Sequence, residues 1–233
     1  MTKMIFALQF SLILLIFVCP PLFVAFSENL AVDFSKFNYF SLLGFLLALF
    51  LYFQDKRERF LEGIPVQDNK RGLWKAADFT SHYFLTFGSL AICAALFELI
   101  GLAVKTPAFE NVILPKNFLQ GLVCAFSLAA AAFYEECLYR LYLPKAMKKI
   151  LDRIKAGKKT RAALIYFAEG AAVLLFAFAH RYQGSLALLN ALLAGAVLRL
   201  SFVKSKSLWP PFFAHLTFNA AALFFYANVN QPA

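Results

Sequence analysis

Long apolar stretches separated by short polar segments are the dominant pattern along this chain. A run of about 20 mostly apolar residues is long enough to cross a bilayer as a helix. Because only helices and closed barrels satisfy their backbone hydrogen bonds in lipid, the pattern favours an all-α polytopic membrane protein. Counting the runs predicts about seven transmembrane helices in one bundle, over Ile5–Phe26, Phe37–Phe53, Phe79–Val104, Phe118–Leu143, Ala162–His180, Ser185–Phe202 and Leu208–Ala227.

The first run, Ile5–Phe26, has two interpretations. Lys3 precedes it and small residues follow it, which is also the pattern of a cleavable signal peptide. We favour a retained helix, because the apolar stretch is longer than a usual signal core. The sequence contains no internal repeat or low-complexity tract, so we expect residues 1–233 to form a single membrane domain.

Composition and charge agree with a membrane protein. Hydrophobic residues make up 61% of the chain, charged residues 15%, and the mean hydropathy is +0.67, outside the range of soluble domains. The net charge of +10 comes from Lys and Arg gathered in Asp55–Lys75 and Lys145–Arg161, whereas Glu28–Lys36 and Lys105–Lys116 are sparsely charged. This alternation predicts a cytoplasmic N-terminus and an outer C-terminus. It leaves no basic face for nucleic acid, so no nucleic-acid partner is expected.

The segment Met147–Lys159 also has two interpretations. Ile150, Leu151 and Ile154 are spaced among lysines, as in a short amphipathic helix lying on the anionic lipids of the inner leaflet. The equal alternative is a solvated basic loop that only obeys the orientation rule.

All four cysteines lie in apolar runs, without a Cys-x-x-C pair or a neighbouring His at metal-ligand spacing: Cys19, Cys93, Cys124 and Cys137. We interpret them as small packing residues rather than disulfides or zinc ligands. A nucleophilic role for Cys137 is the weaker alternative.

A few ionisable and amide side chains interrupt the C-terminal apolar runs. A charge at the bilayer centre costs about 2.5–3.5 kcal/mol on insertion scales, so such groups normally face a polar site inside a bundle. We therefore expect a polar intramembrane cavity. The candidate residues are Glu135, Glu136, Arg140, His180, His215 and Asn219.

Helical spacing suggests roles for the acidic pair. Glu136 and Arg140 are four residues apart, so they share a helix face and can pair, while Glu135 is rotated about 100° away. We expect Arg140 to neutralise and position the two acids and Glu135 to face the cavity as a proton acceptor.

Three motifs follow one another on successive apolar runs. They are Glu-Glu-x-x-x-Arg at Glu135–Arg140, Phe-x-x-x-His at Phe176–His180 and His-x-x-x-Asn at His215–Asn219, the last preceded by Ser-Leu-Trp-Pro-Pro at Ser207–Pro211. In this order and context they resemble the motifs of the CAAX protease and bacteriocin-processing (CPBP, Abi) family of intramembrane endopeptidases. The resemblance extends from Phe118 to about Tyr226.

The resemblance implies a catalytic core over residues 118–227, with three additional transmembrane helices over residues 1–104. It implies a peptidase in which Glu135 activates a water, His180 assists, and His215 with Asn219 stabilises the oxyanion. We favour a mechanism without a cofactor. The alternative is a catalytic zinc bound by Glu135, His180 and His215.

Depth in the membrane constrains the fifth helix. Glu135 lies roughly 13 Å inside the cytoplasmic boundary, whereas a helix that enters the membrane at Ala162 would place His180 about 27 Å deep. Crossing the boundary near Glu169 instead brings His180 to about 16 Å. We therefore predict that this helix lies partly outside the hydrocarbon core and that Arg181–Gly184 turns at the cavity.

The resemblance implies a peptide or protein substrate, either membrane-associated or lipid-modified, and the location we expect is a prokaryotic inner membrane. Two other functions remain open. The first is a proton- or ion-coupled transporter that uses the buried Glu and His residues, although paired broken helices in two halves are lacking. The second is a scaffold that keeps the family's fold without turnover.

Overall fold

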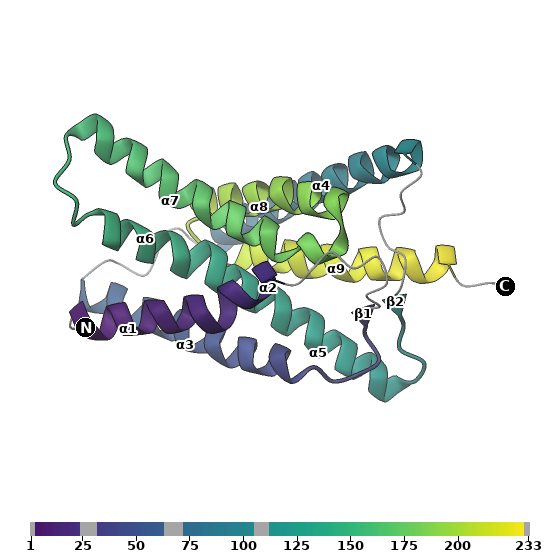
Figure 1. Ribbon diagram of the computed structural model, residues 1–233. Helices are drawn as coiled ribbons and strands as arrows, with labels where there is room; N and C mark the ends of the chain where they lie inside the picture. The colour runs from purple at the N-terminus through teal and green to yellow at the C-terminus, as the bar shows by residue number, and fades with distance from the viewer. Residues whose placement is uncertain (1–2, 24–31, 63–71, 105–111, 231–233) are drawn as a thin grey trace.

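The computed structural model describes residues 3–23, 32–62, 72–104 and 112–230. Helices account for nearly all of this part of the chain (Figure 1). In order, the elements are α1 (Lys3–Ile13), η1 (Leu14–Val18), α2 (Cys19–Phe23), β1 (Val32–Asp33), α3 (Tyr39–Leu61), α4 (Gly72–Val104), β2 (Val112–Ile113), α5 (Phe118–Glu135), η2 (Glu136–Tyr142), α6 (Leu143–Leu151), α7 (Lys158–Ala179), η3 (Arg181–Gln183), α8 (Ser185–Ser205) and α9 (Trp209–Asn230).

The helices form one elongated bundle, with the two chain termini at opposite ends (Figure 1). Helix α4 packs against α8 and α9, α3 packs against α5, and α7 packs against α6 and α8. The two short strands form a parallel pair in which Val32 lies opposite Val112. The predicted all-α polytopic membrane fold is confirmed.

Five described helical segments are long and apolar enough to cross a membrane: Met4–Phe23, Ala76–Val104, Phe118–Leu151, Lys158–Ala179 and Ser185–Ser205. The predicted count of seven is not confirmed. Helix α3 carries a charged run from Asp55 to Arg59, and α9 carries Pro, His, Thr and Asn, which lower the mean hydropathy of both helices.

Several helices extend beyond their predicted bounds. Helix α3 continues past Phe53 to Leu61, and α4 begins at Gly72 rather than Phe79, so hydropathy marks the apolar part of a helix and not its polar ends. The last predicted residues of the first run, 24–26, lie outside the described residues.

The basic segment Met147–Lys159 is neither one amphipathic helix nor one loop. Its first residues are the end of α6, which stops at Leu151, and its last residues are the start of α7 at Lys158. Only the six residues between these helices are non-helical.

Helices α5, η2 and α6 run on as one rod from Phe118 to Leu151, and the middle of this rod is the most buried part of the bundle. Every residue from Glu136 to Leu141 is buried. Apolar side chains pack on one side of η2 around Leu138 and Phe176, and on the other side around Cys137 and Phe212. Any polar group in η2 is therefore surrounded by protein.

Polar side chains and one glycine fix the ends of helices near the site. Asn117 caps α5, because its side-chain oxygen accepts a hydrogen bond from the amide of Gln120 at 2.9 Å. Between η3 and α8, Gly184 adopts a φ of +105°, which residues with a Cβ rarely adopt. The chain thus turns sharply just after His180, and Figure 1 shows this turn stopping short of the C-terminal ends of α4 and α9.

The two basic segments meet at one end of the bundle. Lys145 of α6 pairs with Asp55 at 2.9 Å and with Glu58 at 2.8 Å, both on α3. Lys149 lies over the ring of Phe6 from α1, with its Nζ 4.9 Å from the ring centre. The charged ends of α1, α3 and α6 are therefore on the same side, as the orientation rule requires of segments that face one compartment.

Candidate active site

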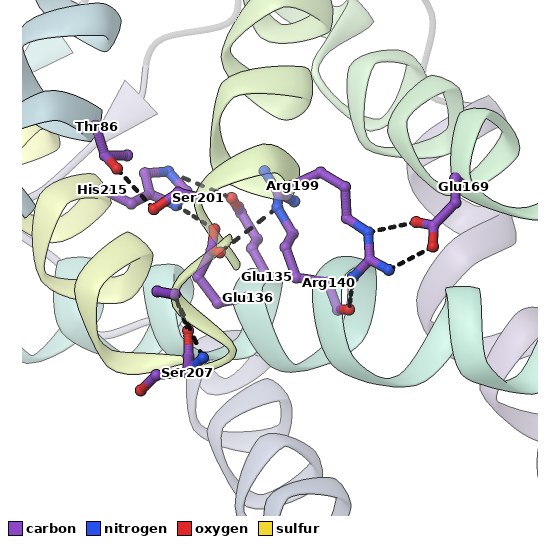
Figure 2. Close-up of polar contacts among 10 residues, drawn as sticks. Thr86, Glu135, Glu136, Arg140, Glu169, Arg199, Ser201, Ser207 and His215 are labelled. Carbon is purple, nitrogen blue, oxygen red and sulfur yellow. Dashed lines mark hydrogen bonds and ion pairs between the residues drawn. The ribbon is translucent and has the colours of Figure 1, made fainter. Parts of the chain in front are cut away.

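Five of the six predicted site residues converge from three helical rods. Figure 2 shows four of them, Glu135, Glu136, Arg140 and His215. Glu135 is the last residue of α5, and Glu136 and Arg140 lie in η2. His180 caps the C-terminus of α7, and His215 lies on α9. The site is therefore assembled by tertiary packing, not by one local motif.

The carboxylate of Glu135 lies between two imidazoles. Its Oε1 is 3.9 Å from Nε2 of His180, and its Oε2 is 3.7 Å from Nε2 of His215. Both distances exceed that of a direct hydrogen bond. Glu135 and His180 each keep about a fifth of the side chain exposed, 20% and 21%, so this carboxylate is the accessible acid of the pair.

The other ring nitrogens fix the tautomers of both histidines. Nδ1 of His180 is 2.8 Å from the carbonyl oxygen of Phe176, which can only accept, so Nδ1 carries a proton. Nδ1 of His215 is 3.0 Å from Oε1 of Glu136 and donates to that carboxylate. In each neutral imidazole the lone pair is therefore on Nε2, the atom that faces Glu135.

Glu136 is fully enclosed and has two partners. Besides His215, it faces Arg140, whose Nε lies 3.5 Å from its Oε2. The Arg140 side chain is 2% exposed, and its other donors have no hydrogen-bond partner among the described residues. The predicted pairing of Glu136 with Arg140 is thus observed as a buried ion pair.

The contacts of the Phe176 ring explain why an aromatic residue stands one turn before His180. The guanidinium carbon of Arg140 lies 3.9 Å from the centre of the Phe176 ring, a cation–π contact. The same ring packs against His180, with centres 4.5 Å apart. Gly195 of α8 makes room for it, because a Cβ there would lie 2.8 Å from Cδ1 of Phe176.

The acidic pair stands at the start of a π-helical turn, not in a regular α-helix. A π-helix bonds each amide to the carbonyl five residues back, and such turns are frequent at functional sites. The α-helical spacing used to place Glu136 and Arg140 on one face was therefore not the true local geometry. The pair still forms, since residues four apart also lie close in the wider turn.

Asn219 is the predicted site residue that the structure does not bring into direct contact with the others. It lies on α9 one turn after His215 and is half-buried. Within the described residues its side chain makes no hydrogen bond to Glu135 or Glu136.

The sequence pattern did not identify Arg199 as a residue of the site, and it predicted only a position at the membrane boundary for Glu169. Arg199 of α8 donates to both carboxylate oxygens of Glu169 and to the backbone carbonyl of Arg140 (Figure 2). Glu169, which we placed at the membrane boundary, also pairs with Lys148. The lone charge of Arg199 between Leu198 and Leu200 was the available signal.

Cysteine chemistry and a preformed metal cluster find no support in the geometry. All four cysteines are free, and Cys137 packs fully buried among apolar side chains. No group of three His, Cys, Asp or Glu side chains in the described part of the chain has metal-binding geometry.

Comparison with known proteins gives one match. The model of the family described as type II CAAX prenyl endopeptidase Rce1-like matches residues 117–221. No curated protein and no solved structure matches the chain. The matched segment contains every predicted site residue from Glu135 to Asn219. Residues 117–221 thus match the family that the motifs indicated, the CAAX proteases.

Proposed function

We propose that this chain is an intramembrane endopeptidase that hydrolyses a peptide bond of a membrane-associated or lipid-modified peptide near the cytoplasmic face. The family match supports a protease with a peptide or protein substrate. One observation carries the proposal: an accessible carboxylate, Glu135, lies between Nε2 of His180 and Nε2 of His215, on other helices.

The spacing around Glu135 suits a bound water better than a direct contact. At 3.7 and 3.9 Å the carboxylate is too far from either imidazole for a hydrogen bond, and a water between them bridges such gaps readily. The water donates one hydrogen to Glu135 and the other to the Nε2 lone pair of His180. Its own lone pair is then free to attack a carbonyl carbon while Glu135 takes the proton.

His215 is suited to the oxyanion that this attack creates. Its Nδ1 proton is held by Glu136, so a second proton on Nε2 makes an imidazolium with a free donor toward the site. The carboxylate of Glu135 lies 3.7 Å from Nε2 of this ring and that of Glu136 lies 3.0 Å from Nδ1, so both are placed to stabilise positive charge on it. A donor preorganised where charge develops typically contributes about 10²–10³-fold in rate.

Asn219 completes the proposed oxyanion site after a small change in the position of its side chain. It is one turn beyond His215 on α9, and its amide is not committed to another described residue. The tetrahedral intermediate then collapses as Glu135 returns its proton to the leaving nitrogen, the carbon–nitrogen bond breaks, and a carboxylic acid and an amine leave.

The family's description names its members as prenyl endopeptidases, and for the present chain we propose the wider class of membrane-associated or lipid-modified peptides. We also propose that the end of the bundle holding Asp55, Glu58 and Lys145 is cytoplasmic, in a prokaryotic inner membrane. The pairing of both basic segments at one end supports this orientation. Anionic inner-leaflet lipids are the expected neighbours of these lysines.

Glu135→Gln tests the function most directly. Purified parent in proteoliposomes should cleave a farnesylated Cys-a-a-X reporter peptide, and E135Q should insert normally and lose activity. Glu98→Gln is the matched control, because Glu98 is exposed on α4 and belongs to none of the three motifs. Cleavage by E135Q at the parental rate refutes the role of Glu135. Glu135-dependent ion flux without peptide cleavage would instead identify a transporter.

A further inference from the structure

A proline in the central rod removes the donor that one carbonyl needs. In an α-helix the amide of residue 144 would bond the carbonyl of residue 140. Pro144 has no amide hydrogen, and its ring crowds that carbonyl as well. The rod widens into the π-helical turn Glu136–Tyr142, which ends two residues before Pro144. The carbonyl of Arg140 therefore lacks its regular α-helical donor and is open to a donor from another helix.

Arg199 of α8 supplies this donor. Its Nη1 donates to the Arg140 carbonyl oxygen, while its Nε and Nη2 hold the carboxylate of Glu169 on α7. The Arg199 side chain is 12% exposed, so protein shields these bonds from water. A planar guanidinium serves two partners in fixed directions, which a lysine ammonium does not. One side chain thus joins the π-helical turn to α7 and α8 (Figure 2).

The π-helical turn determines how the acids face the imidazoles. Glu136 opens the turn and Glu135 directly precedes it, so the backbone path through η2 sets the direction of both carboxylates. Their partners, His180 and His215, are held by separate helices and would not follow a shift of η2. A displacement of about 1 Å in a catalytic constellation costs about a hundredfold in rate.

We propose that Arg199 is a positioning residue for the reaction. By bonding the Arg140 carbonyl freed by Pro144, it holds the π-helical turn in the form that presents Glu135 and Glu136 to the two histidines. The kinetic part of this inference rests on the proposed peptidase function, whereas its effect on the backbone of η2 does not.

The first experiment compares Arg199→Met with Lys148→Met. Both residues pair with Glu169, and of the two it is Arg199 that also bonds the Arg140 carbonyl. With the farnesylated reporter peptide, R199M should lower kcat by about tenfold or more and leave KM within about twofold, while K148M keeps the parental kcat. Parental kcat in R199M, or an equal loss in K148M, overturns the proposal.

A double variant separates positioning from simple stabilisation. Pro144→Ala restores an amide that can bond the Arg140 carbonyl, so P144A/R199M should regain the thermal stability lost in R199M. The central rod of the double variant can then adopt regular α-helical hydrogen bonding. That backbone no longer presents Glu135 and Glu136 to the two histidines, so kcat should stay low. Recovery of kcat together with stability would show that Arg199 only caps a carbonyl. If R199M does not insert, Arg199→Lys replaces it, with a kcat loss of about fivefold or more expected and parental kcat overturning the proposal.

Amide hydrogen exchange tests the same inference without catalysis. In R199M the amides of residues 136–143 should exchange faster than in the parent, whereas K148M should match the parent. Equal protection in R199M and the parent overturns the proposal even if the peptide is cleaved. Absence of cleavage by the parent refutes the proposed function and leaves this exchange experiment decisive.

Discussion

The guanidinium of Arg140 lies over the ring of Phe176, with its central carbon 3.9 Å from the ring centre. This contact joins the Glu-Glu-x-x-x-Arg motif of the rod to the Phe-x-x-x-His motif of α7. The ring also packs on His180, so one aromatic side chain supports both an ion-pair partner and an imidazole of the site.

We expect Phe176→Leu to lower both stability and activity. Leucine keeps the site apolar but removes the π face under Arg140, a contact of about 1–2 kcal/mol when desolvated. His180 also loses its ring neighbour, so kcat should fall more than stability alone explains. Phe178→Leu is the matched control, since Phe178 is 46% exposed on the same helix. Equal effects of F176L and F178L in thermal unfolding and peptide cleavage would contradict this role.

Gly195→Ala should be harmful although alanine favours helices. The added Cβ would lie 2.8 Å from Cδ1 of Phe176, and overpacking of this kind costs about 1–3 kcal/mol. Displacement of the ring should reduce kcat as well. Gly88→Ala on α4 is the control, because no atom lies within 4 Å of its added Cβ. Differential scanning fluorimetry should show a lower Tm for G195A and an unchanged or higher Tm for G88A.

Hydropathy predicted the positions of the helical rods because burial in lipid requires long apolar runs. It did not predict their polar ends, such as Gln54–Leu61 of α3, because propensity and ion pairs continue a helix after its apolar part ends. The match of residues 117–221 to the family confirms the resemblance carried by the three motifs. The catalytic roles of the motif residues remain predictions.

The sequence pattern could not predict the π-helical turn or the role of Arg199, and the reason is physical. The turn arises where Pro144 conflicts with the carbonyl one turn before it, and a proline near the end of an apolar run normally predicts only a helix end. Arg199 follows no motif spacing, and its partner is a backbone atom, which side-chain patterns do not report. The available signal in the sequence was an ionisable residue, Arg199, inside an apolar run and outside the three motifs.

Glu136→Gln should leave the site assembled and still reduce turnover. A glutamine oxygen can accept from Nδ1 of His215, but it cannot balance the imidazolium or Arg140. Loss of the acid behind a catalytic histidine costs about 10⁴ in the serine protease example, and we expect a loss of at least about 10² in kcat here. KM should change little. Steady-state kinetics on the reporter peptide with parental kcat would contradict the role of Glu136.

Chelation separates the favoured mechanism from its zinc alternative. In a tetrahedral site with bonds of about 2.0–2.1 Å, ligand atoms lie about 3.3 Å apart, closer than the 3.7 and 3.9 Å between Glu135 and the two Nε2 atoms. We therefore expect prolonged treatment with a zinc chelator, followed by its removal, to leave the cleavage rate unchanged. Loss of activity that added zinc restores, with bound zinc detected by elemental analysis, would establish the metal mechanism.

Low pH should weaken the contact between α3 and α6 at the charged end of the bundle. Burial alone raises the pKa of Glu58, but the hydrogen bond and charge of Lys145 outweigh it, so the pKa lies below its ordinary value of 4.5. A carboxyl whose pKa is lowered by folding stabilises the protein above its unfolded pKa and loses this contribution as pH falls through the folded pKa. Glu58→Gln should therefore lower the Tm at pH 7, by an amount that corresponds to about 1 kcal/mol or less for a partly exposed pair. At a second, acidic pH below the folded pKa of Glu58, the difference from the parent should shrink toward zero. Glu62→Gln, at the exposed end of α3, should match the parent at both pH values, and a difference for E58Q that persists unchanged at low pH would show that the ion pair with Lys145 is not its cause.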